Sequence, residues 1–157
     1  MEIRNGNAFG LEVALGLIRA RPNPLHLLEC KALTGKDADI NALLRYDLEA
    51  SRAVAFAADG EDALVCGLSV FGDERIPVWM TTTKGIERRP RWLWRNTLQC
   101  WKSLDQLVTH GTVYWPWVPE FYTLGLNFAR HLGPVIRKRR PSPATGAMLC
   151  LMEREVR

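Results

Sequence analysis

A group of basic residues around one glycine is the part of the sequence best suited to hold an anion. Lys84, Arg88 and Arg89 surround Gly85, and Pro90 follows in the position that opens many helices. Backbone amides at the start of a helix attract phosphate groups, and nearby cations strengthen that attraction. The pattern indicates either a phosphate-binding turn or a solvated basic helix start.

A second basic run lies near the end of the chain, at Arg137, Lys138, Arg139 and Arg140. The net charge of +4 is divided unevenly, because residues 1–83 carry 8 basic and 12 acidic side chains and residues 84–157 carry 13 and 5. Such a basic half attracts polyanions: nucleotide phosphates, nucleic acid or an acidic protein surface. A solvated face is the alternative interpretation.

Other chemistry is not supported by the spacing of residues. The four cysteines have no CxxC pair and no histidine at metal-ligand spacing, so no zinc site is expected. No Ser/His/Asp or Cys/His arrangement is visible. Three cysteines have apolar neighbours and are expected to be buried, reduced thiols: Cys66, Cys100 and Cys150.

Length and composition are those of one soluble domain spanning residues 1–157, with 47% hydrophobic and 24% charged residues. No apolar run approaches the roughly 20 residues of a membrane span. The apolar stretch Leu11–Ile18 contains Glu12 and lacks a basic lead, so it makes a poor signal peptide.

Hydrophobic periodicity predicts a short strand and two helices in the first third of the chain. The strand is Met1–Arg4, and the first helix is Ala8–Ala20, with one apolar stripe at Phe9, Val13 and Leu17. Leu11, Leu15 and Ile18 lie beside that stripe. The segment Arg21–Pro24 is expected to break the helix, and Lys36–Leu48 to form the next one.

The period then changes to that of strands. Strands are predicted at Arg52–Ala58, Ala63–Phe71 and Ile76–Thr83, the first two joined as a hairpin. A helix from Pro90 to near Gly111 follows, and Pro116 interrupts a strand at Thr112–Val118. A helix opened by Pro119 and Glu120, with an apolar stripe from Phe121 to Leu132, precedes strands at Pro134–Lys138 and Gly146–Glu153. The predicted class is α/β (α+β): a mixed sheet with helices on both faces, in the order β-α-α-β-β-β-α-β-α-β-β.

Two segments resemble a known family. Val78–Arg95 (VWMTTTKGIERRPRWLWR) and Val113–Pro134 (VYWPWVPEFYTLGLNFARHLGP) are similar to parts of the GNAT-like, acetyltransferase-fold proteins of short-tailed bacteriophages, of the internal virion protein A type. The resemblance covers about residues 29–152, and Glu29 and Ser51 fall where that family often has Glu and Ser. It implies the GNAT fold.

The resemblance also implies which residues would act if the chain binds acetyl-CoA. The pyrophosphate-binding stretch would hold Thr82, Thr83, Lys84, Gly85, Arg88 and Arg89, although it has one glycine where the family pattern has two. Ala129 or Phe128 stands where active enzymes have an acidic tyrosine. Tyr122 is a possible substitute, and Glu29 and Glu120 are the possible bases.

The six tryptophans all lie between residues 79 and 117. Trp94 and Trp101 fall on the apolar stripe of the helix that starts at Pro90, with Leu98, Leu104 and Val108, and are expected in the core. Trp92 lies off that stripe. Exposed tryptophans beside basic residues indicate a protein interface in preference to nucleic-acid binding.

The sequence favours a phage virion-associated or morphogenesis protein, located in the virion or the host cytoplasm. It would use a catalytically inactive GNAT fold to bind other virion proteins, in an oligomeric assembly, without a cofactor. The alternative is a small N-acetyltransferase that uses acetyl-CoA with an atypical site. A third hypothesis is DNA contact through Arg137–Arg140.

Overall fold

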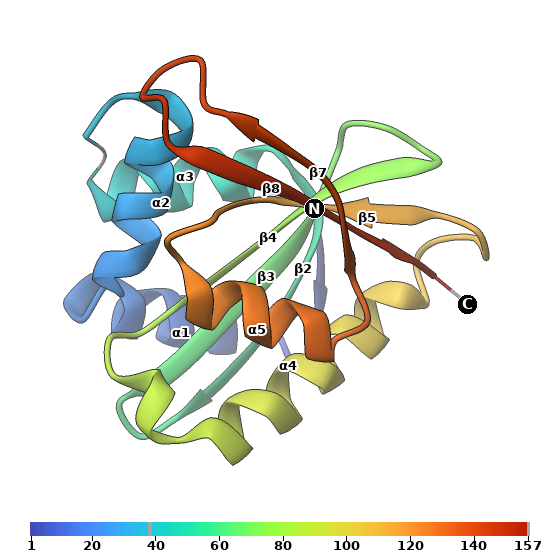
Figure 1. Cartoon of the computed structure of the whole chain (residues 1–157). Helices are drawn as coiled ribbons and strands as arrows, with labels where there is room; N and C mark the ends of the chain where they lie inside the picture. Colours follow the sequence, from blue (N-terminus) through green and yellow to red (C-terminus); the bar gives the residue numbers. More distant parts are fainter. Residues whose placement is uncertain (38, 157) are drawn as a thin grey trace.

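The chain folds around an eight-stranded mixed sheet with helices on both faces, as a computed structural model shows (Figure 1). The structure describes residues 1–37 and 39–156, with only the backbone at Leu124 and Phe128. Hydrogen-bonded neighbours in the sheet follow the order β1-β2-β3-β4-β5-β8-β6, and β7 pairs with β8. The β1–β2 and β4–β5 pairs are parallel and the others antiparallel. The predicted fold class is confirmed.

The first half of the chain contains β1 (Glu2–Arg4), α1 (Ala8–Ala20), α2 (Pro24–Thr34), α3 (Ile40–Glu49), β2 (Ser51–Asp59) and β3 (Asp62–Ser69). The second half contains β4 (Arg75–Thr82), the single 3₁₀ turn η1 (Ile86–Arg88), α4 (Pro90–Asp105), β5 (Val113–Trp115), β6 (Trp117–Pro119), α5 (Thr123–His131), β7 (Val135–Pro141) and β8 (Met148–Glu155).

The helix α2 is missing from the sequence prediction, which treated Arg21–Pro24 as a break. Asn23 is instead the N-cap of α2, and its side chain accepts a hydrogen bond from Leu25 N at 3.0 Å. Pro24 takes the first helical position, where its missing N–H costs nothing. Gly35 ends the helix with a φ of 74°. The next helix therefore starts at Ile40, and the predicted start at Lys36 is wrong.

Three predicted helix faces also need correction. In α1 the neighbouring row, with Leu11, Leu15 and Ile18, is buried, whereas Phe9 and Val13 are exposed. In α4, Trp92 is buried against the sheet, while Trp94 is only partly buried and meets His131 of α5 edge-on, with 6.0 Å between ring centroids. The helix α5 begins at Thr123, so Phe121 precedes it and is exposed. In each case the sheet's position selects the buried row, which periodicity alone leaves open.

Successive residues of the central strands face opposite sides of the sheet. Ala53 and Ala55 of β2 pack on the α4 side, and Val54 packs on the side of α1 and α3. A third cluster lies under α5, where Val118, Leu126, Cys150 and Met152 meet. The four cysteines are free, and Cys66, Cys100 and Cys150 are buried as expected.

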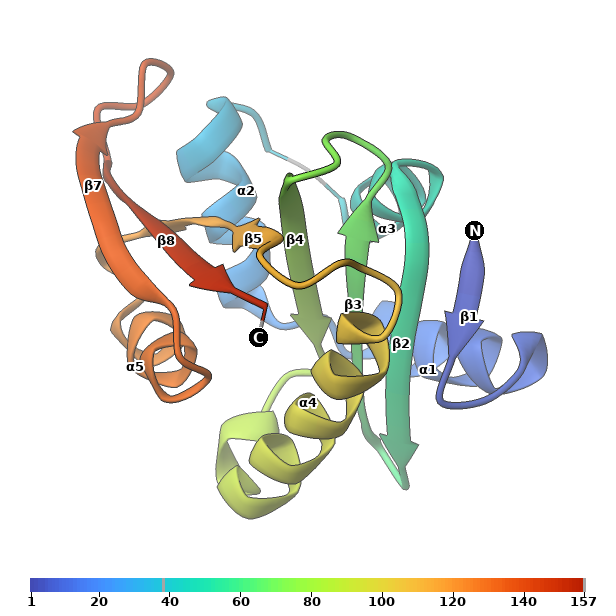
Figure 2. The ribbon, with the colours of Figure 1, turned by 90° about the vertical axis from the view of Figure 1, so that its right-hand side faces the viewer.

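The strands β4 and β5 pair over only the first part of β4, and the sheet opens beyond it. The parallel ladder between β4 and β5 joins only Arg75, Ile76 and Pro77 to residues 113–115. It stops there because Pro116 ends β5, and the carbonyl of Pro116 accepts a hydrogen bond from Met152 N of β8 at 3.1 Å. The chain then continues as β6, which pairs with β8. The strand β8 runs at an angle to β4 (Figure 2). Within residues 1–37 and 39–156, the edge of β4 from Val78 to Thr82 consequently has no strand partner on this side.

Trp79 fastens this part of β4 to the start of β2. Its indole Nε1 donates a hydrogen bond to Ser51 Oγ at 2.8 Å. Its ring covers Gly67 of β3 so closely that a Cβ there would lie 2.5 Å from Nε1. Trp79 therefore packs over its neighbouring strand, on the side of α1 and α3.

We expect Gly67→Ala to lower the free energy of unfolding by about 2 kcal/mol, because the added methyl group must displace Trp79. Gly16→Ala is the matched control: the site is an exposed helix interior with nothing within 4 Å, so it should gain roughly 0.5–1 kcal/mol. Urea denaturation measures both. Equal stability of Gly67→Ala and the parent would contradict this packing.

Candidate functional site

The turn after β4 carries backbone amides that no group in the described chain accepts. Gly85 adopts a φ of 84°, in the left-handed region that glycine enters easily, and starts the turn η1. The N–H groups of Arg88 and Arg89 are bonded within the turn, but those of Gly85, Ile86 and Glu87 are not. Buried Ile86 anchors the turn in the core. Three successive N–H groups beside the start of α4 thus have no backbone acceptor within the described chain.

The basic residues around this turn differ in whether they form ion pairs. Arg89 is held between Asp59 and Asp62 of the β2–β3 hairpin, with 2.8 Å from the guanidinium to each carboxylate. These two bonds raise the pKa of Arg89. Lys84 and Arg88 are exposed and form no ion pair with the described residues. Of the predicted cations, these two remain available to an anion.

A pocket of about 410 Å³ lies between the turn and the hairpin. Its lining combines acidic and basic side chains in equal number: Asp59, Glu61 and Asp62 with Arg21, Arg88 and Arg89, beside Gly60 and Gly85. Arg21 is paired with Glu61, as Arg89 is with Asp59 and Asp62. Most positive charge in the pocket is thus already neutralised.

Thr82 and Thr83, the other two residues predicted for the cofactor, point into the protein. Thr82 Oγ1 accepts a hydrogen bond from Asn23 at 3.1 Å, and Thr83 Oγ1 accepts one from Ala63 N at 3.1 Å. Both residues are buried. Their hydroxyl groups fasten the end of β4 to the start of α2 and to β3, so a ligand would meet only their backbone.

A group of ionisable side chains gathers where α2 and α3 meet. His26 Nδ1 lies 3.5 Å from a carboxylate oxygen of Glu29, and both side chains are largely buried. His26 Nε2 is buried and has no hydrogen-bond partner in the described chain. Burial raises the pKa of Asp47 to about 6; nearby His26 lowers it and nearby Glu29 raises it further. Two carboxylates and one imidazole therefore share a poorly solvated region.

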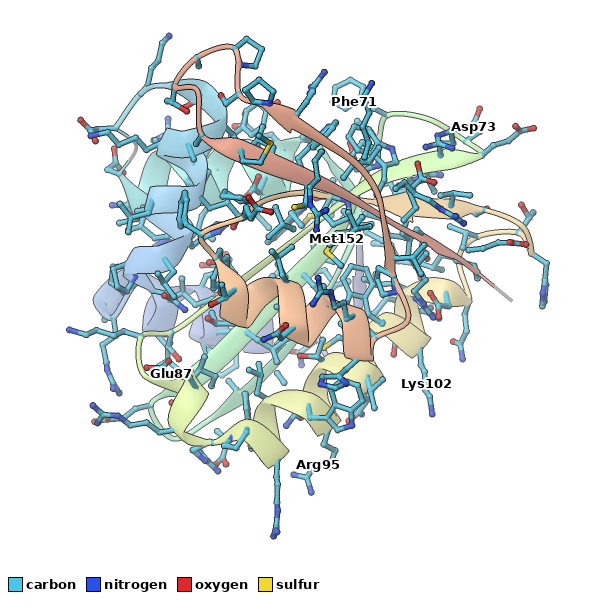
Figure 3. The ribbon with its side chains drawn as sticks, in the orientation of Figure 1. Phe71, Asp73, Glu87, Arg95, Lys102 and Met152 are labelled. Atoms are coloured by element: carbon cyan, nitrogen blue, oxygen red, sulfur yellow. The ribbon has the colours of Figure 1, made fainter. Side chains whose placement is uncertain are left out.

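Tyr122 stands just before α5 and reaches the same region. Burial, together with the charges of Glu29 and Glu87, raises the pKa of Tyr122 to about 12. Its hydroxyl makes no hydrogen bond with the described residues. Of the candidates from sequence, Glu29 thus lies near enough to Tyr122 for its charge to raise the pKa of the hydroxyl, and Glu87 lies at the turn after β4 (Figure 3).

Glu120 lies elsewhere. Its side chain is about half exposed and pairs with Arg139 of β7 at 3.4 Å. Ala129 packs in the cluster under α5, and the side chain of Phe128 lies outside the described residues. Ser51 accepts the hydrogen bond from Trp79 and donates one to the carbonyl of Asp47, so it supports β4 and α3.

Asp47 was missed by the sequence analysis, which expected backbone amides at this helix start but did not identify which of them would be free. Nothing in the local sequence marks Asp47, because its neighbours His26 and Glu29 come from another helix. The local sequence signal for these amides is the glycine at residue 85, which starts the turn. Among residues 1–37 and 39–156, no group of three or more His, Cys, Asp or Glu side chains is placed to hold a metal ion. No described helix is long and apolar enough to cross a membrane.

Several solved structures with a similar arrangement of strands and helices are named as acetyltransferases. A ribosomal-protein-alanine N-acetyltransferase from Brucella melitensis is 10% identical, with a TM-score of 0.66 over 92% of this chain and 95% of that one. YncA, a putative acetyltransferase of Salmonella typhimurium solved with acetyl-CoA, is 8% identical, with a TM-score of 0.67 over 98% and 92%. A putative GNAT-family acetyltransferase from Desulfovibrio desulfuricans is 10% identical, with a TM-score of 0.61 over 94% and 96%.

The chain therefore has the GNAT acetyltransferase fold, as the sequence predicted. No protein-family model matches the sequence. A comparison with curated proteins finds no match. Nothing in these findings indicates a phage or internal virion protein, so the resemblance is supported at the level of the fold.

The stability of the protein should depend on pH through Asp47. The folded chain holds the Asp47 proton up to a pKa of about 6, compared with an ordinary value of 3.8. Since the folded state binds this proton more tightly, stability is lost as pH rises from about 4 to about 6, by about 3 kcal/mol at most.

We expect Asp47→Asn to raise the free energy of unfolding by about 2 kcal/mol at pH 7.5, because the amide carries no charge to bury. The gain should vanish below about pH 4, where the parent is protonated. Exposed Asp73, mutated to Asn, serves as the control and should change stability little at either pH. A pH-independent effect of Asp47→Asn in urea titrations would show that its charge is not the cause.

Proposed function

We propose that this protein is an N-acyltransferase that uses a coenzyme A thioester. The observation that carries the proposal is the row of free amides at Gly85, Ile86 and Glu87, at the end of a strand whose edge is itself unpaired. Free donors at a helix start suit a pyrophosphate group. The GNAT fold adds to this, since YncA was solved with acetyl-CoA and a NatC complex with CoA.

The residues present fit the phosphate end of such a cofactor. The three amides can donate to phosphate oxygens, and the exposed cations Lys84 and Arg88 can lie beside them. A Cβ added at Gly85 would meet nothing within 4 Å, so the space over the turn is open. Arg89 keeps the hairpin in place through Asp59 and Asp62 and is not needed as a ligand. Acetyl-CoA, when bound, would supply the activated acetyl group.

The cluster between α2 and α3 suits the amine side of the reaction. An acceptor amine is a cation in water, and the carboxylates of Glu29 and Asp47 favour its approach. The amine must lose a proton before it can attack a thioester. A carboxylate whose pKa is raised to about 6, as that of Asp47 is, accepts a proton more readily than an ordinary one near neutral pH.

Tyr122 suits the other end of the reaction. Because its pKa is raised to about 12, its hydroxyl keeps its proton and remains a hydrogen-bond donor at every physiological pH. Such a donor stabilises the negative charge that develops on a leaving sulfur. Tyr122 would then replace the tyrosine that is absent at Ala129, from a position two turns earlier in the sequence.

The proposal reverses the order of the two functions that the sequence suggested. The protein-binding scaffold was favoured because the loop has one glycine and lacks a tyrosine at residue 129. The free amides depend on the turn geometry, which a single glycine at residue 85 provides. A scaffold without cofactor is thus the outcome that binding experiments must distinguish.

Isothermal calorimetry with acetyl-CoA should give a micromolar dissociation constant. We expect Lys84→Ala combined with Arg88→Ala to weaken it roughly tenfold, since two charge-assisted phosphate contacts are lost. Arg95→Ala is the matched control: this exposed cation points away from the body of the molecule, further along α4, and its loss should change affinity less than twofold (Figure 3). Absence of binding by the parent protein would overturn the proposal in favour of the scaffold.

Thiol release from acetyl-CoA in the presence of small amines and peptides tests the chemistry. We expect Tyr122→Phe to lower kcat about a hundredfold with little change in acetyl-CoA affinity, because one donor to the leaving group is removed. Glu120→Gln, at a carboxylate that pairs with Arg139 away from the cluster, should leave turnover unchanged. Full turnover by Tyr122→Phe would remove Tyr122 from the mechanism.

A further inference from the structure

The strand β7 is an edge of the sheet with four basic residues among its seven. Among the described residues it pairs with β8 alone, and Figure 2 shows it at the outer side of the molecule. All its residues are exposed except Ile136, which is partly buried. Its backbone groups on the outer edge therefore face solvent, beside four consecutive cations at residues 137–140.

Two of the four cations are already paired. Arg137 lies 3.6 Å from Glu153, and Arg139 lies 3.4 Å from Glu120. Lys138 and Arg140 form no ion pair with the described chain. Their positions opposite Leu151 and Leu149 of β8 place both on one face of the strand. One face of this edge strand therefore has two cations, two positions apart, without an ion-pair partner in the described chain.

Arg140 is held in a defined place by Trp117. Its guanidinium carbon lies 4.3 Å from the centroid of the indole ring. Stacking of this kind uses the face of the guanidinium and leaves the N–H donors in its plane free for a carboxylate. The same contact covers one face of Trp117, which is therefore closed to a stacking nucleobase.

A second copy of this chain is a poor partner for the edge. Antiparallel pairing of β7 with another β7 would set like charges opposite one another along the strand, which destabilises such pairs. Charged edge strands avoid self-association in this way. The same charges attract an acidic strand. The charge of β7 therefore favours an acidic partner strand over the β7 of a second copy of this chain.

We propose that β7 binds an extended acidic segment of another protein, which adds to the sheet as a further strand. Main-chain hydrogen bonds to the outer edge of β7 would provide affinity. Alternate acidic side chains of the segment would meet Lys138 and Arg140, which selects the sequence. Free backbone groups beside the charges favour a polypeptide over a nucleic acid, which offers no complementary backbone. The proposal is independent of acyl transfer.

Fluorescence polarisation tests it with a labelled peptide of alternating threonine and glutamate. We expect the parent chain to bind this peptide, and the double variant Lys138→Glu, Arg140→Glu to bind it at least tenfold more weakly. The single variant Lys138→Glu, which keeps the Arg140–Trp117 contact, should lie between them. The matched control is Arg95→Glu, Lys102→Glu, two exposed cations on α4, and it should bind within twofold of the parent (Figure 3).

Two further probes separate strand addition from a general attraction for anions. The same peptide with alternate backbone nitrogens methylated keeps its charges but cannot pair as a strand, and should bind at least tenfold more weakly. Single-stranded oligothymidylate should also bind more weakly than the parent peptide. Equal binding of the methylated peptide, equal or tighter binding of the oligonucleotide, or no binding of the unmodified peptide would each overturn the proposal.

Discussion

The arrangement of this molecule depends on the point at which β4 and β5 stop pairing. Pro116 cannot extend the ladder, and its carbonyl is bonded to Met152 on β8. The parallel pairing is therefore limited to three residue pairs, and in the described part of the chain the edge of β4 opposite β3 has no strand partner beyond Pro77. The amide turn proposed to bind the cofactor lies at the end of that edge, where Thr82 is bonded to Asn23 at the start of α2.

The basic sequence run at the turn after β4 suggests several free cations, but part of this positive charge is paired with acidic residues in the structure. Arg89 is held by the acidic hairpin between β2 and β3, and Arg21 is paired with Glu61 in the same pocket. These pairs fix the turn in position and leave the backbone amides as its main open donors. The anion-binding capacity of the segment thus rests on the conformation at Gly85 more than on the number of cations around it.

The strands were predictable because the apolar runs of β2 and β3, the turn between them and the proline within residues 112–118 are local features. The helix α2 was not, since Asn-Pro serves equally well as a break or as an N-cap followed by a first helical proline. The buried face of α4 was predicted in part: Trp101 and Leu104 of the expected stripe are buried, whereas Trp92, which lies off that stripe, is buried in place of Trp94. Periodicity defines rows of residues, and tertiary packing selects among them.

Part of the candidate site was within reach of sequence and part was not. Gly85, Lys84 and Arg88 lie in one short stretch, and the family-like segments pointed to Glu29 and Tyr122. The pKa of Asp47 is raised by burial in the folded chain, with a further increase from nearby Glu29 and an opposing effect of His26. Thr82 and Thr83 show the reverse case, since their hydroxyl groups are bonded inside the protein. Neither interaction can be predicted from the local sequence, because each joins residues far apart in the chain.

The most direct test of the central claim is an amide-resolved NMR titration of the protein with coenzyme A. If the turn binds the pyrophosphate, the N–H resonances of Gly85, Ile86 and Glu87 should shift together and saturably, ahead of those in the hairpin at residues 59–62. Unchanged resonances at these three amides, at coenzyme A concentrations that saturate known acetyltransferases, would contradict the account.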